Sequence, residues 1–160
     1  MTVDAIKDEL DTRRHDVQIA IENYQHDFNI GTIVRNANAF NVSAVHIIGK
    51  RHWNRRGAMV TDRYLHIHQH STTHEFLAAV GTDTQVIGVD NIEGSIPLAT
   101  ANLPKNCVLV FGGEGPGLSD EMIAACKELI AIEQFGSTRS VNVGVASGIV
   151  LYEWVRRNAL

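Results

Sequence analysis

The feature that most constrains the fold is an apolar run that ends in a glycine-rich segment. Cys107–Phe111 is a continuous apolar stretch of strand length, and four of the next six residues, 112–117, are glycine. Apolar runs bounded by turn residues are typical of strands buried on both faces of a sheet. Glycine lets the backbone turn sharply and approach a neighbour closely. The segment therefore predicts a buried parallel strand followed by a tight loop whose backbone approaches a ligand and which carries one carboxylate, Glu114.

Strand and helix patterns alternate along the remainder of the chain. Alternating or continuous apolar residues predict further strands, and apolar residues at helical spacing or helix-capping residues predict helices. The predicted strands are residues 17–22, 44–49, 64–68, 85–89 and 129–132; the predicted helices are residues 30–40, a segment from Thr72 or Thr73 to Gly81, a short segment capped by Ser119, and residues 142–157. This alternation predicts an α/β fold, with a mostly parallel sheet covered by helices on both faces.

Length and composition favour one globular domain. The chain has 160 residues, 44% of them hydrophobic, so we expect a single domain, residues 1–160, with a helical lead-in at residues 1–16. No apolar stretch is long enough to cross a membrane, and the first residues lack the apolar region of a signal peptide. Cys107 and Cys126 do not have a metal-ligand spacing. We therefore expect two reduced core thiols and a cytoplasmic protein.

Two common nucleotide-binding motifs do not fit the glycine segment. Gly112 and Gly117 have the spacing of a P-loop, but Leu118 stands where a lysine must contact the phosphates. Gly113 and Gly115 begin a Rossmann pattern, whose third glycine position is again Leu118. We therefore expect neither ATP or GTP hydrolysis nor NAD or FAD binding. A compact ligand without phosphates, recognised by backbone groups in a snug cleft, fits the loop better.

Two further segments place polar residues where a helix is predicted to begin. Residues 29–37 read Asn-Ile-Gly-Thr-Ile-Val-Arg-Asn-Ala, and residues 140–144 read Ser-Val-Asn-Val-Gly. Together with residues 111–118, they resemble the three motifs of the SpoU (TrmH) branch of the SPOUT RNA methyltransferases, in the same order. The resemblance extends over residues 17–157, almost the whole chain. Three ordered motifs are far more specific than one glycine loop.

The resemblance implies a fold, a cofactor and a reaction. It implies that the C-terminal region, residues 107–157, threads through an earlier loop as a deep trefoil knot, which general topology rules would reject. It also implies a homodimer that uses S-adenosylmethionine to methylate a ribose 2′-oxygen of RNA. A non-catalytic RNA-binding or assembly protein that keeps the fold is the alternative. By resemblance, the cofactor would be bound by three loops through Val89, Asp90, Gly112, Gly113, Glu114, Ile132, Gln134, Ser140 and Val141.

Five polar residues of the three motifs are the catalytic candidates: Arg35, Asn29, Glu114, Ser140 and Asn142. In similar enzymes the arginine faces the ribose 2′-hydroxyl. Because a guanidinium stays protonated, we expect Arg35 to stabilise negative charge on that oxygen while an RNA phosphate or water takes the proton. Asn29 would cap its helix and belong to the substrate site, and Glu114 would accept hydrogen bonds from backbone or from Arg35. As alternatives, Arg35 would be a surface salt-bridging residue, and Ser140 or Asn142 an ordinary helix cap.

The net charge of −4 requires any RNA contact to come from a local basic patch. Residues 50–56, called the basic segment below, hold four of the fourteen lysines and arginines. The RNA-binding candidates are Lys50, Arg51, Trp53, Arg55, Arg56 and, elsewhere, Arg139. The tryptophan would either stack on an unpaired base or fold onto the core. The chain shows no extra N-terminal RNA-binding domain of the kind that many ribosomal-RNA members carry, which favours transfer RNA as substrate.

Three histidines, His66, His68 and His70, alternate and would share one face of a strand. Imidazoles spread along a single strand do not converge easily on a zinc ion, and no cysteine or acid completes the set nearby. We therefore expect no metal.

Overall fold

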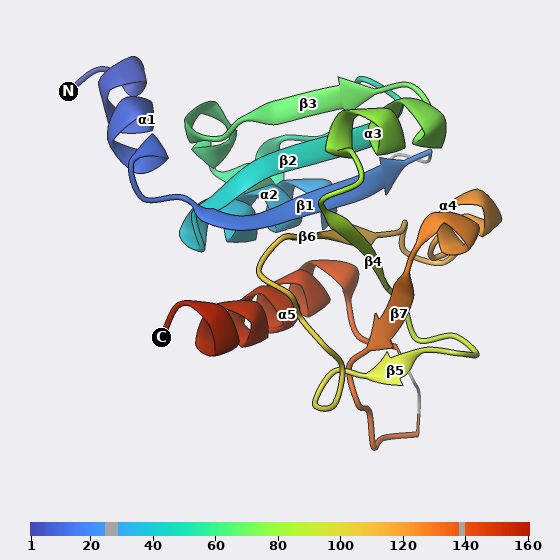
Figure 1. Ribbon diagram of the computed structural model, residues 1–160. Coiled ribbons are helices and arrows are strands. Elements are labelled where there is room, and N and C mark those ends of the chain that lie inside the picture. Colours follow the sequence, from blue (N-terminus) through green and yellow to red (C-terminus); the bar gives the residue numbers. More distant parts are fainter. Residues whose placement is uncertain (25–28, 138–139) are drawn as a thin grey trace.

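A seven-stranded sheet in the order β3-β2-β1-β6-β4-β7-β5 forms the centre of the molecule (Figure 1). The computed structural model describes residues 1–24, 29–137 and 140–160. Neighbouring strands pair in parallel throughout this sheet. The strands are β1 (His15–Asn23), β2 (Val42–Gly49), β3 (Ile67–His70), β4 (Gln85–Val89), β5 (Ile96–Pro97), β6 (Cys107–Phe111) and β7 (Glu128–Ala131). The predicted parallel α/β sheet is confirmed.

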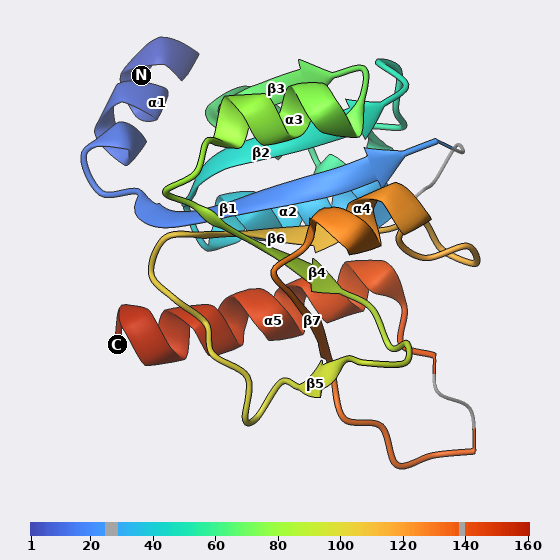
Figure 2. The ribbon, with the colours of Figure 1, turned by 45° about the vertical axis from the view of Figure 1, so that its right-hand side comes forward.

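Helices cover both faces of the sheet, as Figure 2 shows, with α2 and α5 on one face and α3 and α4 on the other. The helices are α1 (Val3–Asp11), α2 (Asn29–Ala39), α3 (Thr73–Val80), α4 (Asp120–Ala125) and α5 (Val143–Asn158), with short 3-10 helices at Arg56–Ala58 and Thr61–Tyr64. Two core clusters result. The larger contains Trp154 of α5, and the smaller packs Phe76 of α3 and Met122 of α4 against the opposite face. Among the described residues, no helix is both long and apolar enough to cross a membrane.

Helix starts follow the predicted capping residues. The Thr72 hydroxyl accepts a hydrogen bond from the backbone N–H of Glu75, and the Ser119 hydroxyl accepts one from Met122. The Asn142 side chain accepts one from Val145 at 3.2 Å. Each cap satisfies one of the N–H groups that a helix start leaves unpaired.

The prediction of a strand at residues 64–68 is wrong in its first half. Thr61–Tyr64 is a 3-10 helix, and β3 begins only at Ile67. The Leu65 N–H closes this turn on the Asp62 carbonyl, and the Tyr64 carbonyl accepts from the guanidinium of Arg14 at 2.7 Å. These contacts satisfy the backbone without a sheet partner. The two-residue strand β5 lies at the sheet edge, where a proline without an N–H for pairing is tolerated.

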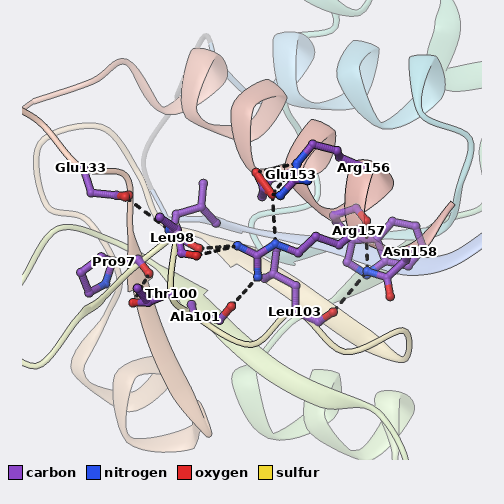
Figure 3. A network of polar contacts seen from close by, with 12 residues as sticks. Pro97, Leu98, Thr100, Ala101, Leu103, Glu133, Glu153, Arg156, Arg157 and Asn158 are labelled. Carbon is purple, nitrogen blue, oxygen red and sulfur yellow. Dashed lines mark hydrogen bonds and ion pairs between the residues drawn. The ribbon is translucent and has the colours of Figure 1, made fainter. Parts of the chain in front are cut away.

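The last turn of α5 is hydrogen-bonded to the loop that follows β5, and Figure 3 shows the contacts of Arg157 and Asn158. Arg157 donates to the carbonyl oxygens of Leu98 at 2.7 Å and of Ala99 and Ala101. The neighbouring Asn158 and Trp154 donate to the carbonyls of Leu103 and Pro104, respectively. On its other side the same loop pairs with β7, because the Leu98 N–H donates to the Ala131 carbonyl at 2.8 Å. The loop is therefore held between the last strand and the last helix.

We expect Arg157→Gln to lower the free energy of unfolding by about 1–3 kcal/mol, because it leaves half-buried carbonyls without their donor. Arg156→Gln is the matched control, because among the described residues the Arg156 side chain bonds only to Glu153, and it lies exposed. Its removal should change stability little. Urea unfolding of both variants measures the difference. Equal effects of the two substitutions would contradict a specific role of Arg157 in holding this loop.

Candidate functional site

A cavity of about 250 Å³ opens where the carboxyl ends of β4, β6 and β7 meet. In open parallel sheets, ligands bind outside these strand ends. Its described wall comes from the ends of these three strands and from the segments that follow them: residues 89–91 at β4, residues 111–115 and Gly117 at β6, and Ala131, Ile132, Gln134, Ser140, Val141, Val143 and Ala146 from β7 to α5. All nine predicted cofactor residues line it: Val89, Asp90, Gly112, Gly113, Glu114, Ile132, Gln134, Ser140 and Val141. The structure thus brings together three segments far apart in sequence; their binding role stays a prediction.

The glycine segment forms its wall with backbone because it folds back on itself. The Gly117 N–H donates to the Gly113 carbonyl at 2.9 Å. A Cβ on Gly112 would overlap the backbone of Gly117, so only glycine fits there. Gly117 has φ +69°, and its backbone lies against Asp90, whose carboxylate accepts from the Leu118 N–H at 3.1 Å. These contacts fix the β6 loop against the β4 loop.

At the edge of the cavity, one carboxylate joins the starts of two helices. Glu114 Oε2 accepts hydrogen bonds from the amides of Asn29 at 2.6 Å and Asn142 at 3.3 Å. Asn29 begins α2, and Asn142 caps α5. Three of the five catalytic candidates are therefore in direct contact, although they are separated by up to 113 residues in sequence (142 minus 29). Ser140 lies beside them in the lining of the same cavity.

Residues 16–152 match the sequence model of the SpoU rRNA Methylase family. This match covers most of the chain. The chain belongs to the SpoU methylase family.

Several relatives of this SpoU chain carry the names of RNA methyltransferases. A tRNA (guanosine(18)-2′-O)-methyltransferase from Escherichia coli K12 is 25% identical over 91% of the chain, and one from Aquifex aeolicus is 26% identical over 95%. A 23S rRNA (guanosine-2′-O-)-methyltransferase from Neisseria meningitidis is 37% identical over 47% of the chain. The chain spans only 65% of the length of the Escherichia coli relative and 74% of the Aquifex one.

Solved structures of the family agree with the fold. The A. aeolicus TrmH/SpoU tRNA modifying enzyme superposes with a TM-score of 0.83 and 25% identity, covering 97% of this chain and 81% of that one. An AdoMet-bound rRNA methyltransferase from Sinorhizobium meliloti gives a TM-score of 0.80 and 25% identity, covering 94% of this chain and 61% of that one. These neighbours imply the predicted knot fold for the SpoU chain, consistent with the loop held between β7 and α5.

Arg35 lies apart from the other candidates of the SpoU site. It is exposed on α2, six residues after Asn29, which corresponds to about 9 Å along the helix axis. It does not line the cavity, and within the described residues it makes no hydrogen bond or ion pair. Of the two kinds of donor expected for Glu114, backbone or Arg35, the arginine makes no such bond, and the amides of Asn29 and Asn142 bind that carboxylate.

Gly57 and Ala58, directly after the basic segment, pack against the start of α2. A Cβ on Gly31 would lie 2.8 Å from the backbone N of Gly57, which leaves room only for glycine at this contact. Of the candidates, Lys50, Arg51, Arg55 and Arg56 are exposed, while Arg139 lies outside the described residues. The basic segment thus connects β2 to a turn that packs against the helix that begins with Asn29.

For Trp53, the structure shows the second of the two expected positions, folded onto the core. Only 3% of its surface is exposed, and it belongs to the larger core cluster. The guanidinium of Arg55 lies 4.3 Å from the ring centroid, while its Nε pairs with Asp62 at 3.3 Å. Arg55 is therefore engaged with its own chain. Lys50, Arg51 and Arg56 have no side-chain partner among the described residues, so these three cations of the segment are available for phosphate contact.

The alternating histidines separate into two environments. His66 precedes β3 and bonds Asp11 at 2.8 Å, whereas His68 and His70 lie against His46 of β2. His46 bonds Gln18 at 2.7 Å and His70 at 2.9 Å. Burial, with the neighbouring His70 and His68, lowers the pKa of His46 to about 3, so this ring stays neutral at physiological pH. No group of three potential ligands in the described part of the chain is arranged to hold a metal ion.

Both cysteines are free thiols. Burial raises the pKa of Cys107 to about 12 and the pKa of Cys126 to about 11, so each remains protonated at neutral pH. A protonated thiol is neither a nucleophile nor a metal ligand. Both residues therefore act as packing groups.

Sequence reasoning missed several residues of the cavity wall: Asn91, Phe111, Gly115, Gly117, Ala131, Val143 and Ala146. Most of them are direct neighbours of predicted residues. Ala146 is four residues after Asn142, the N-cap of α5, so the helical period predicts that the two residues lie on the same face of the helix. A search that extended each motif by one helical turn would have found it.

Proposed function

We propose that the chain is an S-adenosylmethionine-dependent RNA 2′-O-ribose methyltransferase. The observation that carries this proposal is that all nine predicted cofactor residues line one cavity, and that one of them, Glu114, binds the amides of Asn29 and Asn142. Membership of the SpoU family supports the reaction. Two relatives that methylate a ribose of tRNA match nearly the whole chain, and a solved relative binds AdoMet. A non-catalytic RNA-binding protein of the same fold is the alternative that experiment must exclude.

The charge of the cavity favours this cofactor over a nucleoside phosphate. The charged side chains in its described lining are Asp90 and Glu114, both acidic, and Leu118 stands at the position of a P-loop lysine. Two carboxylates and no cation would repel phosphates, whereas a sulfonium and an amino group carry positive charge. Backbone groups of Gly112 and Gly113 would contact the nucleoside part, because no side chain intervenes there.

The roles of the protein groups follow from their chemistry. S-adenosylmethionine supplies a methyl group made electrophilic by its sulfonium. Arg35 stabilises the negative charge that develops on the 2′-oxygen, while the hydroxyl proton leaves to an RNA phosphate or to water. Glu114 keeps the amides of Asn29 and Asn142 in fixed positions, so that the substrate site is preorganised.

Calorimetry and a transfer assay test the proposal together. The protein should bind S-adenosylmethionine or S-adenosylhomocysteine and neither ATP nor NAD. Incubation with methyl-labelled cofactor and total RNA should place label on ribose 2′-oxygens, as nuclease digestion followed by mass spectrometry would show. Tight ATP binding without binding of the methionine nucleosides would refute the cofactor. RNA binding without any transfer would favour the non-catalytic alternative.

Transfer RNA is the proposed substrate, acted on in the cytoplasm by a single domain formed by residues 1–160. The two tRNA-specific relatives cover 91% and 95% of the chain, whereas the Neisseria rRNA relative covers 47%. When purified tRNA and purified rRNA are supplied in separate assays, tRNA should accept more methyl groups than rRNA. Comparing 2′-O-methyl sites in RNA from cells with and without the protein would identify the nucleotide.

We expect the double variant Arg51→Ala, Arg56→Ala to bind RNA more weakly and with a shallower salt dependence. Each lost phosphate contact should reduce the log–log slope by roughly one unit, because fewer counterions are released. Arg13→Ala is the control, since Arg13 is exposed but precedes β1, at the opposite ends of the parallel strands. An unchanged salt slope in the double variant would show that RNA binds to another surface.

We also propose a homodimer formed through α5. Exposed Val145, Ile149 and Tyr152 recur at helical spacing beside a groove of about 600 Å³ between α5 and α2. We expect Ile149→Asp to shift a dimer towards monomer in sedimentation experiments, because it places a charge in an apolar contact. Val3→Asp is the control, since Val3 on α1 is similarly exposed, at 38% against 41% for Ile149. A wild-type monomer, or equal effects of the two variants, would contradict this interface.

A further inference from the structure

Phe135 is the most exposed large apolar side chain that the structure describes, with 95% of its surface accessible. A solitary exposed apolar residue is ordinary on a protein surface. The position of this one is not. It follows Gln134, which lines the cavity, and precedes Ser140 and Val141, which line it again. The side chain therefore stands on the loop that forms the rim of the proposed cofactor site.

The geometry of ribose methylation predicts that a nucleotide base lies at this rim. The acceptor oxygen is on C2′ of a ribose, and the base is attached to the adjacent C1′. A nucleotide whose 2′-oxygen reaches the cavity must therefore hold its base close to the mouth of the cavity. RNA is read mainly where bases are unpaired, and such bases stack on aromatic side chains. An exposed phenyl ring at the rim matches this requirement.

We propose that Phe135 stacks on the base of the methylated nucleotide or of its unpaired neighbour. This inference rests on the proposed methyl transfer to RNA and adds a residue to its substrate site. The ring supplies affinity that does not depend on base identity, because every base has a π face. Its contribution differs in kind from that of Arg51 and Arg56, which would act on phosphates.

A second copy of the chain is the other candidate to cover Phe135. The exposed apolar residues Val145, Ile149 and Tyr152 lie on α5 and flank a groove that Phe135 does not line. Phe135 instead directly follows Gln134, which lines the cofactor cavity. Proximity to the cavity favours the nucleobase, and the oligomeric state of a Phe135 variant tests the alternative.

The experiment compares Phe135→Ala, Phe135→Leu and Phe135→Trp with the wild type. Binding to fluorescein-labelled decauridylate and decaadenylate and to bulk tRNA is measured by anisotropy at several salt concentrations. We expect about a ten-fold loss of RNA affinity for Phe135→Ala, recovery in Phe135→Trp and an intermediate value for Phe135→Leu. The slope of RNA affinity against salt should stay unchanged, because the substitution removes no phosphate contact and binding releases as many counterions as before. Leu160→Ala, which shortens another highly exposed apolar residue, should bind RNA as the wild type does.

Other readouts separate stacking from different roles of the ring. Melting temperature, S-adenosylmethionine affinity and sedimentation should match the wild type, because the exposed ring supports neither core nor cavity. Weaker cofactor binding by Phe135→Ala would make the residue a cover of the cofactor and overturn the inference. Dissociation of a dimer would assign the ring to a second copy, and wild-type RNA affinity would leave it without a substrate role. If wild-type protein transfers no methyl group, the proposed function fails; if it is active and Phe135→Ala equals it in RNA affinity, only this inference fails.

Discussion

Arg35→Ala is expected to abolish methyl transfer while leaving cofactor affinity within a few-fold of wild type. Loss of one preorganised group that stabilises an oxyanion typically costs a factor of about 10²–10³ in rate. Arg35 does not line the cofactor cavity, and within the described residues it holds no ion pair or hydrogen bond. Its removal should therefore change neither cofactor binding nor the melting temperature. Single-turnover methyl transfer and calorimetry on the same preparation measure the two effects.

Arg35→Lys tests the chemistry further. A lysine keeps the charge but lacks the planar fork of the guanidinium, so this variant should also be poor. A fully active Arg35→Ala protein would refute the mechanism and identify Arg35 as an ordinary surface arginine.

The separation of Arg35 from Asn29 allows a test of whether the proposed homodimer shares its sites between subunits. About 9 Å of helix separates the two residues, while Asn29 contacts Glu114 at the cavity edge. If Arg35 acts at the cavity of the other subunit, mixing inactive Arg35→Ala with inactive Glu114→Gln should restore part of the activity. Mixtures that remain inactive would indicate that each subunit uses its own arginine.

The parts of the fold that depend on local patterns were predictable from sequence. Continuous apolar runs gave β4 and β6 at their observed bounds, and Thr72 and Ser119 marked the starts of α3 and α4. The segment before β3 was not predictable. Tyr64 and Leu65 have a strand-like composition, but Arg14, fifty residues earlier, binds the Tyr64 carbonyl. A contact between distant residues decided the backbone conformation there.

The candidate site likewise has a part that was predictable from sequence and a part that was not. The three motifs identified the segments that line the cavity, because glycine and capping residues are constrained by their own backbone. They did not reveal which side chains meet. Glu114 binds two amides rather than Arg35, and Trp53 enters the core beneath Arg55. These outcomes depend on how α2, α5 and the basic segment pack, which no single motif encodes.

Gly112→Ala is expected to remove cofactor binding beyond the range that calorimetry detects. A Cβ at this position would overlap the backbone of Gly117 and Leu118, and neither can move as a side-chain end would. The β6 loop would have to open, so that Gly113 and Glu114 leave the cavity wall and Asp90 loses the Leu118 N–H. Overpacking of this kind also costs about 1–3 kcal/mol of stability.

Gly94→Ala separates loss of the cavity wall from general destabilisation. Gly94 has φ +90°, and a Cβ at this position would have no atom within 4 Å, so alanine there suffers backbone strain of about 1–2 kcal/mol without a clash. Both variants should therefore unfold at lower urea concentrations than the wild type, but only Gly112→Ala should fail to bind S-adenosylmethionine. Wild-type cofactor affinity in Gly112→Ala would show that the folded-back glycine turn is not part of the cofactor site. The acidic cavity at the ends of β4, β6 and β7 would then need another ligand.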